Sequence, residues 1–534
     1  MTLDVRGPAS VRLTLRACRT LLAIVMSVGV VACGALPDQV ERSPSLARQA
    51  STNTPLASLV RASIPDPGLT GFRLMPLGSY SLDARLQLAH RAEDSLDVQY
   101  YLIKEDRTGR LFMRTLRDAA VRGVRVRVLV DDLDTSGSDA MFQGLAAYPN
   151  VEVRLFNPFC CARDSTLSKY LASLRDFRRL NHRMHNKLFI ADGSAAIMGG
   201  RNIADEYFTR REIGNFVDMD VLVVGAAVKR LREIFDQYWN SPQAYPLDTI
   251  APAPEVPEQA RSRFDHLVDD GDQMTSVSMP ASDILGYGPI TEDLDGGRLG
   301  LVWGRAVAFA DSPAKAGATS TEMARSMSVQ MNVMHRVMDA QSEVVISSPY
   351  FVPGPKGLSE LEELTKRSVK VSVLTNSLAA TDEPLVHSGY ARYRHALLRA
   401  GVDLYELSPR RIASSERLRL PGASLGSLHA KAAVIDQTQV FIGSMNLDPR
   451  SDSSNTELGI IADCPQLARE VVRVLNISKL SGSYRLRLAA QGEGLEWLSL
   501  EDDREVVLQH EPEVTPWLKF KTLLFAPLVP EQLL

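Results

Sequence analysis

Short apolar runs rich in β-branched residues alternate with longer stretches of helical spacing through most of the chain. Such runs lie at 96–101, 124–129 and 151–158, and segments with helical spacing separate them. Strands that alternate with helices are typical of α/β units built around a largely parallel sheet. The pattern therefore predicts an α/β fold in which a mostly parallel β-sheet is flanked by helices.

This series of runs occurs twice. The runs at 344–351, 368–374 and 402–409 follow the same order as the first three. Repetition on this scale indicates an internal duplication. We predict two similar lobes, residues 68–245 and 301–485, related by pseudo-twofold symmetry with the active site between them.

Residues 246–300 separate the two predicted lobes. Prolines cluster near their start, and Gly-Asp and Asp-Gly turns follow. Neither feature favours long regular elements. We predict a linker of irregular structure with room for one helix.

The first 32 residues are typical of a secretory signal peptide. Four arginines precede an apolar run at 21–32, which is shorter than the roughly 20 residues of a membrane span. The run ends in Val-Val-Ala-Cys at 30–33, which resembles a bacterial lipobox and implies lipid attachment at Cys33; a plain signal peptide or an uncleaved anchor is the alternative. Residues 33–67 are polar and are expected to form a flexible tether. We predict an exported, membrane-associated lipoprotein on the periplasmic side.

The C-terminal segment 486–534 contains a stretch that mixes aromatic residues, leucines and lysines. Trp517, Phe520 and Phe525 belong to it. Such a composition suits a membrane interface. Packing of the segment on the body of the protein is equally compatible with the sequence.

Length and net charge limit the number of domains and the classes of function that the chain can have. A chain of 534 residues suits two or three domains, and a hydrophobic share of 45% supplies large cores. The formal net charge of -4 argues against broad nucleic-acid binding, which usually needs a basic face.

The cysteines have no metal-binding spacing. Cys160 or Cys161 could form a bridge to Cys464, but free thiols are the favoured interpretation.

Candidate chemistry comes from a motif that occurs once in each predicted lobe. One copy begins with His185-x-Lys187 and the other with His429-x-Lys431. The offsets from each histidine agree: lysine at +2, aspartate at +7, glycine at +14, glycine or serine at +15 and asparagine at +17. The later positions of the motif are Asp192 and Asn202 in the first copy and Asp436, Ser444 and Asn446 in the second.

The spacing has a physical meaning. On a β-strand, residues i and i+2 point to the same face, so each histidine lies beside its lysine. A tight turn and a return strand then bring the asparagine to the pair. Cleavage of a phosphodiester by histidine needs an attacking imidazole, a proton donor on the opposite side of phosphorus, and cations for the equatorial oxygens. Two facing copies supply all of these groups, so we predict one active site with no metal and no cofactor.

The doubled pattern H-x-K-x4-D-x6-G-[GS]-x-N resembles the phospholipase D superfamily and covers nearly the whole chain after the signal peptide. Further similarity, to the bacterial cardiolipin synthases and especially the C type, lies at 97–101, 152–158, 183–187, 199–203 and 347–353. The resemblance implies that His185 is the nucleophile and forms a phosphohistidine. His429 would then protonate the leaving alcohol. The sequence itself does not show which histidine attacks, because the two copies are nearly symmetric.

The resemblance also implies the roles of the other polar residues. The groups expected to hold the phosphate oxygens are Lys187, Lys431, Asn202 and Asn446, with Ser444 a weaker candidate. A downstream carboxylate would orient each histidine, Asp218 after the first motif and Glu457 after the second. Asp192 and Asp436 lie at the far end of their strands, about 20 Å from the histidines at ~3.3 Å per residue. We interpret both as turn or salt-bridge residues.

These features predict a phosphatidyltransferase that acts on phospholipid substrates at a membrane surface. The leading hypothesis is a cardiolipin synthase that uses phosphatidylglycerol and a second phospholipid. The first alternative is a phospholipase D hydrolase that releases phosphatidic acid, because the same site can use water as acceptor. An exported nuclease is disfavoured by the acidic charge, and a noncatalytic lipoprotein scaffold by the two intact motifs. No nucleic-acid partner is expected, and protein partners are left open by the sequence.

Overall fold

The computed structural model describes residues 36–37, 40–49, 53–160, 163, 168, 176–253, 255–269, 279–317, 328–415, 418, 425–490, 494–501, 504–525 and 529–531. The predicted signal peptide, Cys33 and Cys161 lie outside these residues. Among the described helices, none combines the length and apolar character that crossing a membrane requires.

The first half of the chain, which we define as the elements up to α11, begins with alternating helices and strands and continues with the consecutive strands β5 to β8. In chain order these are α2 (Pro55–Ser63), β1 (Thr70–Met75), α3 (Gly78–Arg91), β2 (Ser95–Tyr100), α4 (Arg107–Val121), β3 (Arg125–Asp131), α5 (Asp139–Ala146), β4 (Val151–Phe156), α7 (Phe177–Leu180), β5 (Leu188–Ala191), β6 (Ala195–Gly199), β7 (Asn215–Val217), β8 (Asp220–Gly225), α8 (Ala226–Trp239), β9 (Ala244–Pro246), α9 (Leu247–Ile250), α10 (Pro257–Asp269) and α11 (Ile290–Asp295).

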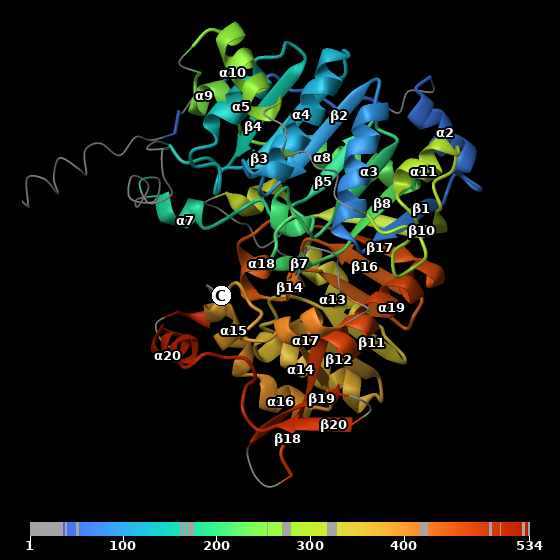
Figure 1. The fold of residues 1–534 in the computed structure, drawn as a ribbon, viewed down its shortest axis with the longest axis vertical. Helices are drawn as coiled ribbons and strands as arrows, with labels where there is room; N and C mark the ends of the chain where they lie inside the picture. The colour runs from blue at the N-terminus through green and yellow to red at the C-terminus, as the bar shows by residue number, and fades with distance from the viewer. Residues whose placement is uncertain are drawn as a thin grey trace, which may run out of the picture.

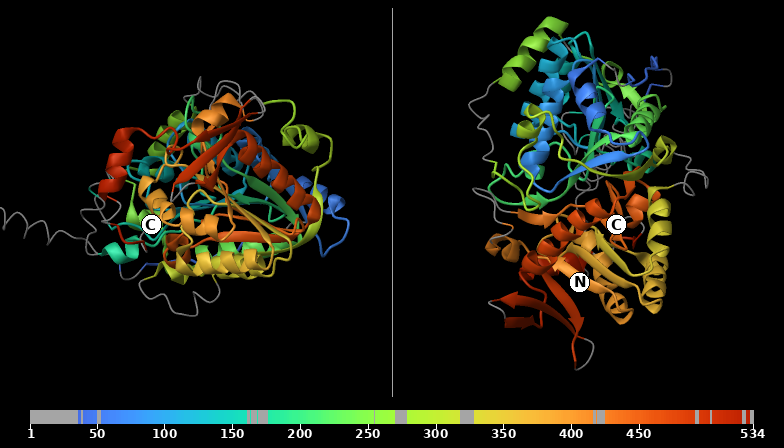
Figure 2. Two further views of the ribbon diagram at one scale, coloured as in Figure 1. Left: turned by 90° about the horizontal axis from the view of Figure 1, so that it is seen from below. Right: turned by 90° about the vertical axis from the view of Figure 1, so that its right-hand side faces the viewer.

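The second half runs from β10 to α20. Its elements are β10 (Val302–Ala310), α13 (Val329–Met338), β11 (Glu343–Ser347), α14 (Gly354–Lys366), β12 (Lys370–Asn376), α15 (Pro384–Ala391), α16 (Arg394–Arg399), β13 (Asp403–Leu407), α17 (Pro409–Ser414), β14 (Leu425–Leu428), β15 (Ala432–Ile435), β16 (Gln439–Gly443), α18 (Pro449–Ser453), β17 (Leu458–Asp463), α19 (Pro465–Gly482), β18 (Ser483–Leu488), β19 (Leu495–Glu501), β20 (Arg504–Leu508) and α20 (Pro516–Phe525). The two halves occupy the upper and lower parts of the molecule in Figure 1, and the right-hand view of Figure 2 shows the same division.

The main sheet has 18 strands and is mixed. The first half contributes the order β9-β4-β3-β2-β5-β6-β8-β1. The second half contributes β10-β17-β16-β15-β11-β12-β13-β18-β19-β20. Antiparallel pairing of β1 with β10 joins the two series.

The prediction of a mostly parallel sheet is wrong. Within the main sheet only β2–β3, β3–β4, β11–β12 and β12–β13 are parallel among the described pairings. The motif strands cause the difference. A short turn joins β5 to β6 and β15 to β16, and strands joined so closely must run antiparallel, because a parallel neighbour needs a crossover of a dozen or more residues.

One hydrophobic core extends across the two halves. Leu231 and Phe235 of α8 belong to the same buried cluster as Leu467 and Val471 of α19. Helix α8 packs against β10 of the second half, and α19 packs against β1 of the first. The halves are therefore held together by apolar burial as well as by the β1–β10 pairing.

Two predicted connections are more ordered than expected. The described part of 246–300 holds three helices, α9, α10 and α11, and α10 packs on α4 and α5. Its buried side chains, Ala260, Phe264 and Val268, recur every four residues, a helical signal that the prolines obscured. The predicted tether is also partly packed, because Leu56 and Val60 of α2 are buried and Ala47 donates to the Asp236 carboxylate.

Candidate active site

The two motif histidines are held by backbone from the opposite half. The His185 N–H donates to Thr456 O at 2.9 Å, and the Thr456 N–H donates to Arg183 O at 2.8 Å. In the other copy, the His429 N–H donates to Val217 O at 2.8 Å. There β14 and β7 form a separate two-stranded parallel sheet. Each motif is therefore positioned by contacts that do not exist within its own half.

The carboxylates also cross between the halves. His185 Nδ1 lies 3.0 Å from Glu457 Oε2, and His429 Nδ1 lies 2.7 Å from Asp218 Oδ2. The expectation that each histidine uses the carboxylate downstream of it is wrong. Asp218 and Glu457 follow the short segments that pair across the halves, so each arrives beside the histidine of the other copy.

The charge state of each pair follows from burial. Burial opposes ionisation of Asp218 and Glu457, but the facing histidines and the nearby lysines outweigh it, so the pKa of each carboxyl is held below its usual range. Burial lowers the pKa of His185 to about 4, against the opposing effect of Glu457. The pKa of His429 is also lowered, by burial and by Lys431. Each pair thus combines an anionic carboxylate with a neutral ring. A ring that donates Nδ1–H to its carboxylate keeps the lone pair on Nε2 for chemistry.

The two motif lysines are buried beside the histidines. Lys187 Nζ donates to His185 O at 2.6 Å, and Lys431 Nζ donates to His429 O at 2.7 Å. Burial holds the pKa of Lys187 well below its usual range and lowers that of Lys431 to about 8. An anion bound between them would restore a favourable environment for both ammonium groups.

The motif asparagines have unused polar atoms. Asn202 Nδ2 donates to the Tyr207 hydroxyl at 3.0 Å. The Oδ1 atoms of Asn202 and Asn446 are buried without a hydrogen-bond partner. A buried amide atom without a partner is costly unless a ligand completes it. These oxygens are therefore available to a hydrogen-bond donor of a bound substrate, whereas the Nδ2 groups are the atoms that can donate to a phosphate oxygen.

The Ser444 hydroxyl points to a carboxylate and not toward the position expected for a phosphate. Its hydroxyl donates to Glu457 Oε2 at 2.5 Å, and Ser451 Oγ donates to Glu457 Oε1 at 2.9 Å. Gly200 takes the place of Ser444 in the first copy, and a Cβ there would lie 2.1 Å from Asp218 Oδ1. Ser444 thus positions Glu457, and its expected role as a phosphate ligand is not supported by its contacts.

The motif aspartates are turn residues. Asp192 accepts backbone N–H groups of residues 93–95, and Asp436 accepts those of 341–343, at distances between 2.7 and 3.2 Å. Both have a left-handed backbone, with φ of 49° and 50°. Each tethers the turn of its hairpin to the start of the neighbouring strand, β2 or β11.

We expect Asp192→Ala to destabilise the protein without changing its chemistry. The substitution removes the side-chain acceptor of three N–H groups, of which that of Ser95 is buried and the other two are partly buried, and the loss at a buried group costs about 1–3 kcal/mol. Chemical unfolding should show a loss of about 2–4 kcal/mol, while the activity per folded molecule stays the same. Asp436→Ala, at a more exposed site, is the matched control and should cost less. A loss of turnover at unchanged stability would contradict the architectural role.

Three aromatic residues outside the motif positions contact the histidines. The Tyr101 ring packs edge-on against His185 at 5.2 Å between centroids. Tyr207 and Phe216 pack against His429 at 5.1 and 5.0 Å. Both of the latter come from the first half, so the two histidines have different surroundings. Their distance from the motifs along the chain hid these contacts.

Two polar residues at strand ends also hold the motif segments. Asp131, at the end of β3, accepts the Met184 N–H at 2.8 Å and pairs with Arg183 at 3.0 Å. Asn376, at the end of β12, accepts the Leu428 N–H at 2.8 Å. The carboxyl ends of parallel strands are frequent positions for sites, and this rule could have identified both residues.

One group of side chains has the composition of a metal site. His387, Glu406 and Glu511 present ligand atoms within 4.8 Å of one another. The Arg394 guanidinium lies among them, at 2.8 Å from Glu406 and 2.6 Å from Glu511. A cation already neutralises these carboxylates, so the group fits a buried ion-pair network better than a metal ion.

The fold and the paired histidine sites together define a phospholipase D-like protein. The sequence profile of the family described as "Cardiolipin synthase, PLD-like domain" matches residues 86–239 and 333–477. The chain belongs to this phospholipase D-like cardiolipin synthase family.

Individual relatives agree with this assignment. The chain is 38% identical over 504 residues to cardiolipin synthase C of Escherichia coli (strain K12), across 91% of this chain and 100% of that protein. It is 31% identical to an uncharacterized protein of Helicobacter pylori (strain ATCC 700392 / 26695), across 78% of this chain and 81% of the relative. In structure it is similar to a phosphatidylserine synthase of Haemophilus influenzae Rd KW20, with a TM-score of 0.56, 13% identity, and coverage of 90% of this chain and 100% of that one. The last similarity supports the fold alone.

Proposed function

We propose that this protein is a phosphatidyltransferase that forms cardiolipin from phosphatidylglycerol and a second phospholipid. The observation that carries the proposal is the pair of buried histidines, each hydrogen-bonded to a carboxylate of the opposite half. Membership of the cardiolipin synthase family supports the substrate class. Phosphatidylethanolamine is the second phospholipid that the sequence resemblance to the C-type enzymes implies.

The proposed reaction has two displacements at phosphorus. Nε2 of the neutral His185 ring attacks the phosphodiester, and the P–O bond to the leaving alcohol breaks. His429 acts from its protonated form, gives its Nε2 proton to that oxygen and becomes neutral. His429 then removes a proton from the acceptor hydroxyl, whose oxygen attacks the phosphohistidine and releases His185. Both steps conserve protons and need no metal ion. Because the pKa of His185 is lowered to about 4, its ring is neutral and able to attack.

Charge at phosphorus would be stabilised by fixed groups of both motifs. Lys187 and Lys431 supply the cations, and the amides of Asn202 and Asn446 supply hydrogen bonds. Groups that are already in place need no reorganisation in the transition state, which makes such stabilisation effective. Burial of the lysines strengthens their attraction for the phosphate by excluding water.

The strand orders support the proposal of two lobes related by a pseudo-twofold axis. The order β4-β3-β2-β5-β6-β8-β1 in the first half has the counterpart β13-β12-β11-β15-β16-β17-β10 in the second. We infer lobes at 68–245 and 301–485. The crossed carboxylates imply that neither lobe forms a working half-site alone.

The site of action proposed here is a membrane surface on the periplasmic side, reached by export and a lipid anchor at Cys33. The lipobox-like tetrad at 30–33 supports this location. Labelling of cells with radioactive palmitate should mark the wild-type chain and not Cys33→Ala. Equal labelling of the two chains would exclude Cys33 as the acylated residue.

Incubation of the protein with labelled phosphatidylglycerol, with and without phosphatidylethanolamine, tests the reaction. Labelled cardiolipin with release of glycerol or ethanolamine is the expected result. Phosphatidic acid as the sole product would identify a phospholipase D hydrolase instead. If no phospholipid is consumed and DNA is cleaved, the proposed substrate class is wrong.

We expect a bell-shaped pH profile of kcat/KM. His185 attacks only as the neutral ring, so the rate should fall as the pH drops below its pKa of about 4. His429 donates a proton only while its ring is protonated, and burial and Lys431 lower its pKa, so the rate should fall again as the pH rises past that pKa. A p-nitrophenyl phosphodiester needs little help from an acid, so the alkaline limb should weaken with this substrate. An alkaline limb of equal depth with both substrates would assign it to another group.

A further inference from the structure

Helix α20 exposes a large apolar surface. Its exposed side chains, as fractions of their full exposure, are Trp517 at 66%, Phe520 at 55%, Leu523 at 66%, Leu524 at 52% and Phe525 at 46%. Thr522 is the helix residue that is buried. Soluble proteins rarely leave so many large apolar groups together in water unless the surface meets a partner or a membrane.

Four of the five exposed apolar residues of α20 share one face, and Phe525 lies outside it. At about 100° per residue, Leu523, Phe520, Leu524 and Trp517 fall within a sector of roughly 120°. Lys519 and Lys521 lie on either side of this sector, and both are exposed. Lysines at these positions can extend to the headgroups while the apolar sector enters the acyl region.

The segments that flank α20 are hydrogen-bonded to the body of the second half. Before it, the Glu511 carboxylate accepts from Arg394 at 2.6 Å, and Glu513 accepts from the Tyr484 hydroxyl at 3.1 Å. After it, Glu531 accepts from the Tyr393 hydroxyl at 2.7 Å. Figure 1 shows α20 at the margin of the second half, beside α15. The exposed face is therefore presented in a fixed orientation.

We propose that α20 docks into the interface of a phospholipid bilayer that carries anionic headgroups. The lysines on both sides of the apolar sector complement a negative surface, and the aromatic side chains suit the headgroup boundary. Docking would hold the protein on the membrane from which the proposed reaction draws its lipids, but it does not require turnover.

Trp517 provides a direct test in the full chain. It is the exposed tryptophan among the described residues, since Trp239 and Trp497 are buried and Trp303 is partly buried. Vesicles of phosphatidylglycerol and phosphatidylcholine with brominated acyl chains should quench its fluorescence. Trp517→Phe keeps the apolar face and should lose the quenching. If the protein sediments with these vesicles and Trp517 is not quenched, α20 is not the docking element.

The lysines give a second, independent measurement. Lys519→Gln and Lys521→Gln should each weaken binding to the anionic vesicles about fivefold, and roughly 30-fold together. Binding to pure phosphatidylcholine vesicles should not change, nor should turnover of lipid dispersed in detergent micelles. Equal losses on both kinds of vesicle would contradict the electrostatic contribution. An absence of turnover in every variant would refute the proposed reaction and leave the docking result intact.

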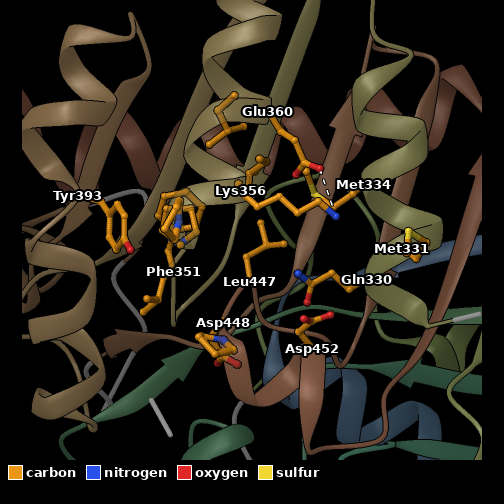
Figure 3. A pocket seen from close by; sticks show the side chains of 18 of the residues that line it. Gln330, Met331, Met334, Phe351, Lys356, Glu360, Tyr393, Leu447, Asp448 and Asp452 are labelled. Atoms are coloured by element: carbon orange, nitrogen blue, oxygen red, sulfur yellow. Dashed lines mark ion pairs between the residues drawn. The ribbon is translucent and has the colours of Figure 1, made fainter. Parts of the chain in front are cut away.

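A separate observation concerns a cavity of about 560 Å³ in the second half. Its apolar lining includes Met331, Met334, Met338, Phe351, Leu361 and Leu447, several of which are labelled in Figure 3. The Lys356–Glu360 pair, 3.6 Å apart, lies at its solvent edge, where Lys356 is 80% exposed. The volume lies within the usual range of ligand pockets, and methionines adapt to flexible ligands.

The cavity lies next to the candidate active site. Leu447 and Asp448 line it and follow Asn446 directly in the sequence. Asp448 accepts the Ser451 N–H at 2.7 Å, and Ser451 in turn donates to Glu457, the carboxylate of His185. On the other side, Glu531 lines the cavity after the chain leaves α20. The cavity thus lies between the site and the segment that follows α20.

We infer that this cavity binds an acyl chain of a phospholipid whose phosphate is held by Asn446 and Lys431. This inference rests on the proposed function. Each methylene buried there contributes favourably, so the cavity would favour long-chain substrates over short-chain ones.

Met334→Trp, which fills the cavity, tests the inference. The ratio of kcat/KM for dipalmitoyl over dihexanoyl phosphatidylglycerol in detergent micelles should fall about tenfold, the equivalent of roughly two methylene groups left unburied. Leu480→Trp, at an exposed position of α19, is the control and should leave the ratio unchanged. An unchanged ratio in Met334→Trp would overturn the inference, as would an equal loss on both lipids. Turnover of neither lipid by the wild-type protein would instead refute the proposed function.

Discussion

Replacement of His185 by alanine is expected to abolish phospholipid turnover and to prevent formation of a covalent intermediate. Removal of a nucleophile that acts together with a base typically costs about 10⁶-fold in rate. His429→Ala should be almost as damaging toward natural lipids, because the leaving alkoxide then has no proton donor. Rapid quenching with phosphorus-labelled substrate, followed by detection of phosphohistidine, measures the first step directly.

A substrate with an acidic leaving group separates the two histidines. A p-nitrophenyl phosphodiester needs little help from an acid, so His429→Ala should still label His185 with it, whereas His185→Ala should not be labelled. His266→Ala, at an exposed position of α10, should behave as the wild type. Labelling of His185→Ala at His429 would reverse the two roles.

The crossed carboxylates lead to the second large effect. Glu457→Gln and Asp218→Asn should each reduce turnover by about 10³–10⁴-fold, because the amide no longer favours the ring tautomer with its lone pair on Nε2. Since Glu457 contacts His185, its substitution should slow formation of the phosphohistidine with any leaving group. Since Asp218 contacts His429, its substitution should be largely rescued by the p-nitrophenyl substrate.

This pattern of rescue is opposite to the one that pairing within each motif would give. If Asp218→Asn resisted rescue and Glu457→Gln were rescued, each carboxylate would serve the histidine of its own copy. Asp220→Asn makes a poor control because Asp220 is buried and paired with Arg85. The exposed Asp295→Asn, on α11, is suitable and should have no effect on either step.

The motifs themselves were predictable because they are local. The i, i+2 spacing on a strand places His185 beside Lys187 whatever surrounds them, and the repeat showed that a second set exists. The role of the two motif aspartates as turn residues was also predictable. A position seven residues along a strand is too far from the histidine to take part in its chemistry. Their backbone contacts with residues 93–95 and 341–343 required the structure.

Strand direction was harder to predict. A buried strand such as β2 has the same apolar character whether its neighbour runs parallel or antiparallel. The hairpin turns at Asp192 and Asp436 were the sequence features that indicate strand direction, since a short turn forces the two strands it joins to pair antiparallel. The helices α9, α10 and α11 were missed because prolines and turns around them conceal short amphipathic patterns.

The sequence by itself determined the motif residues of the candidate site: two histidines, two lysines and two asparagines in equal register, on an α/β fold. Only the tertiary structure decided which groups act together. Asp218 serves His429 and Glu457 serves His185 because short parallel pairings carry each carboxylate across to the other half. Tertiary packing also decided which aromatic rings contact His429, which serines donate to Glu457, and which face of α20 is exposed. Contacts between residues far apart in the chain are set by packing of the whole fold, and no local pattern encodes them.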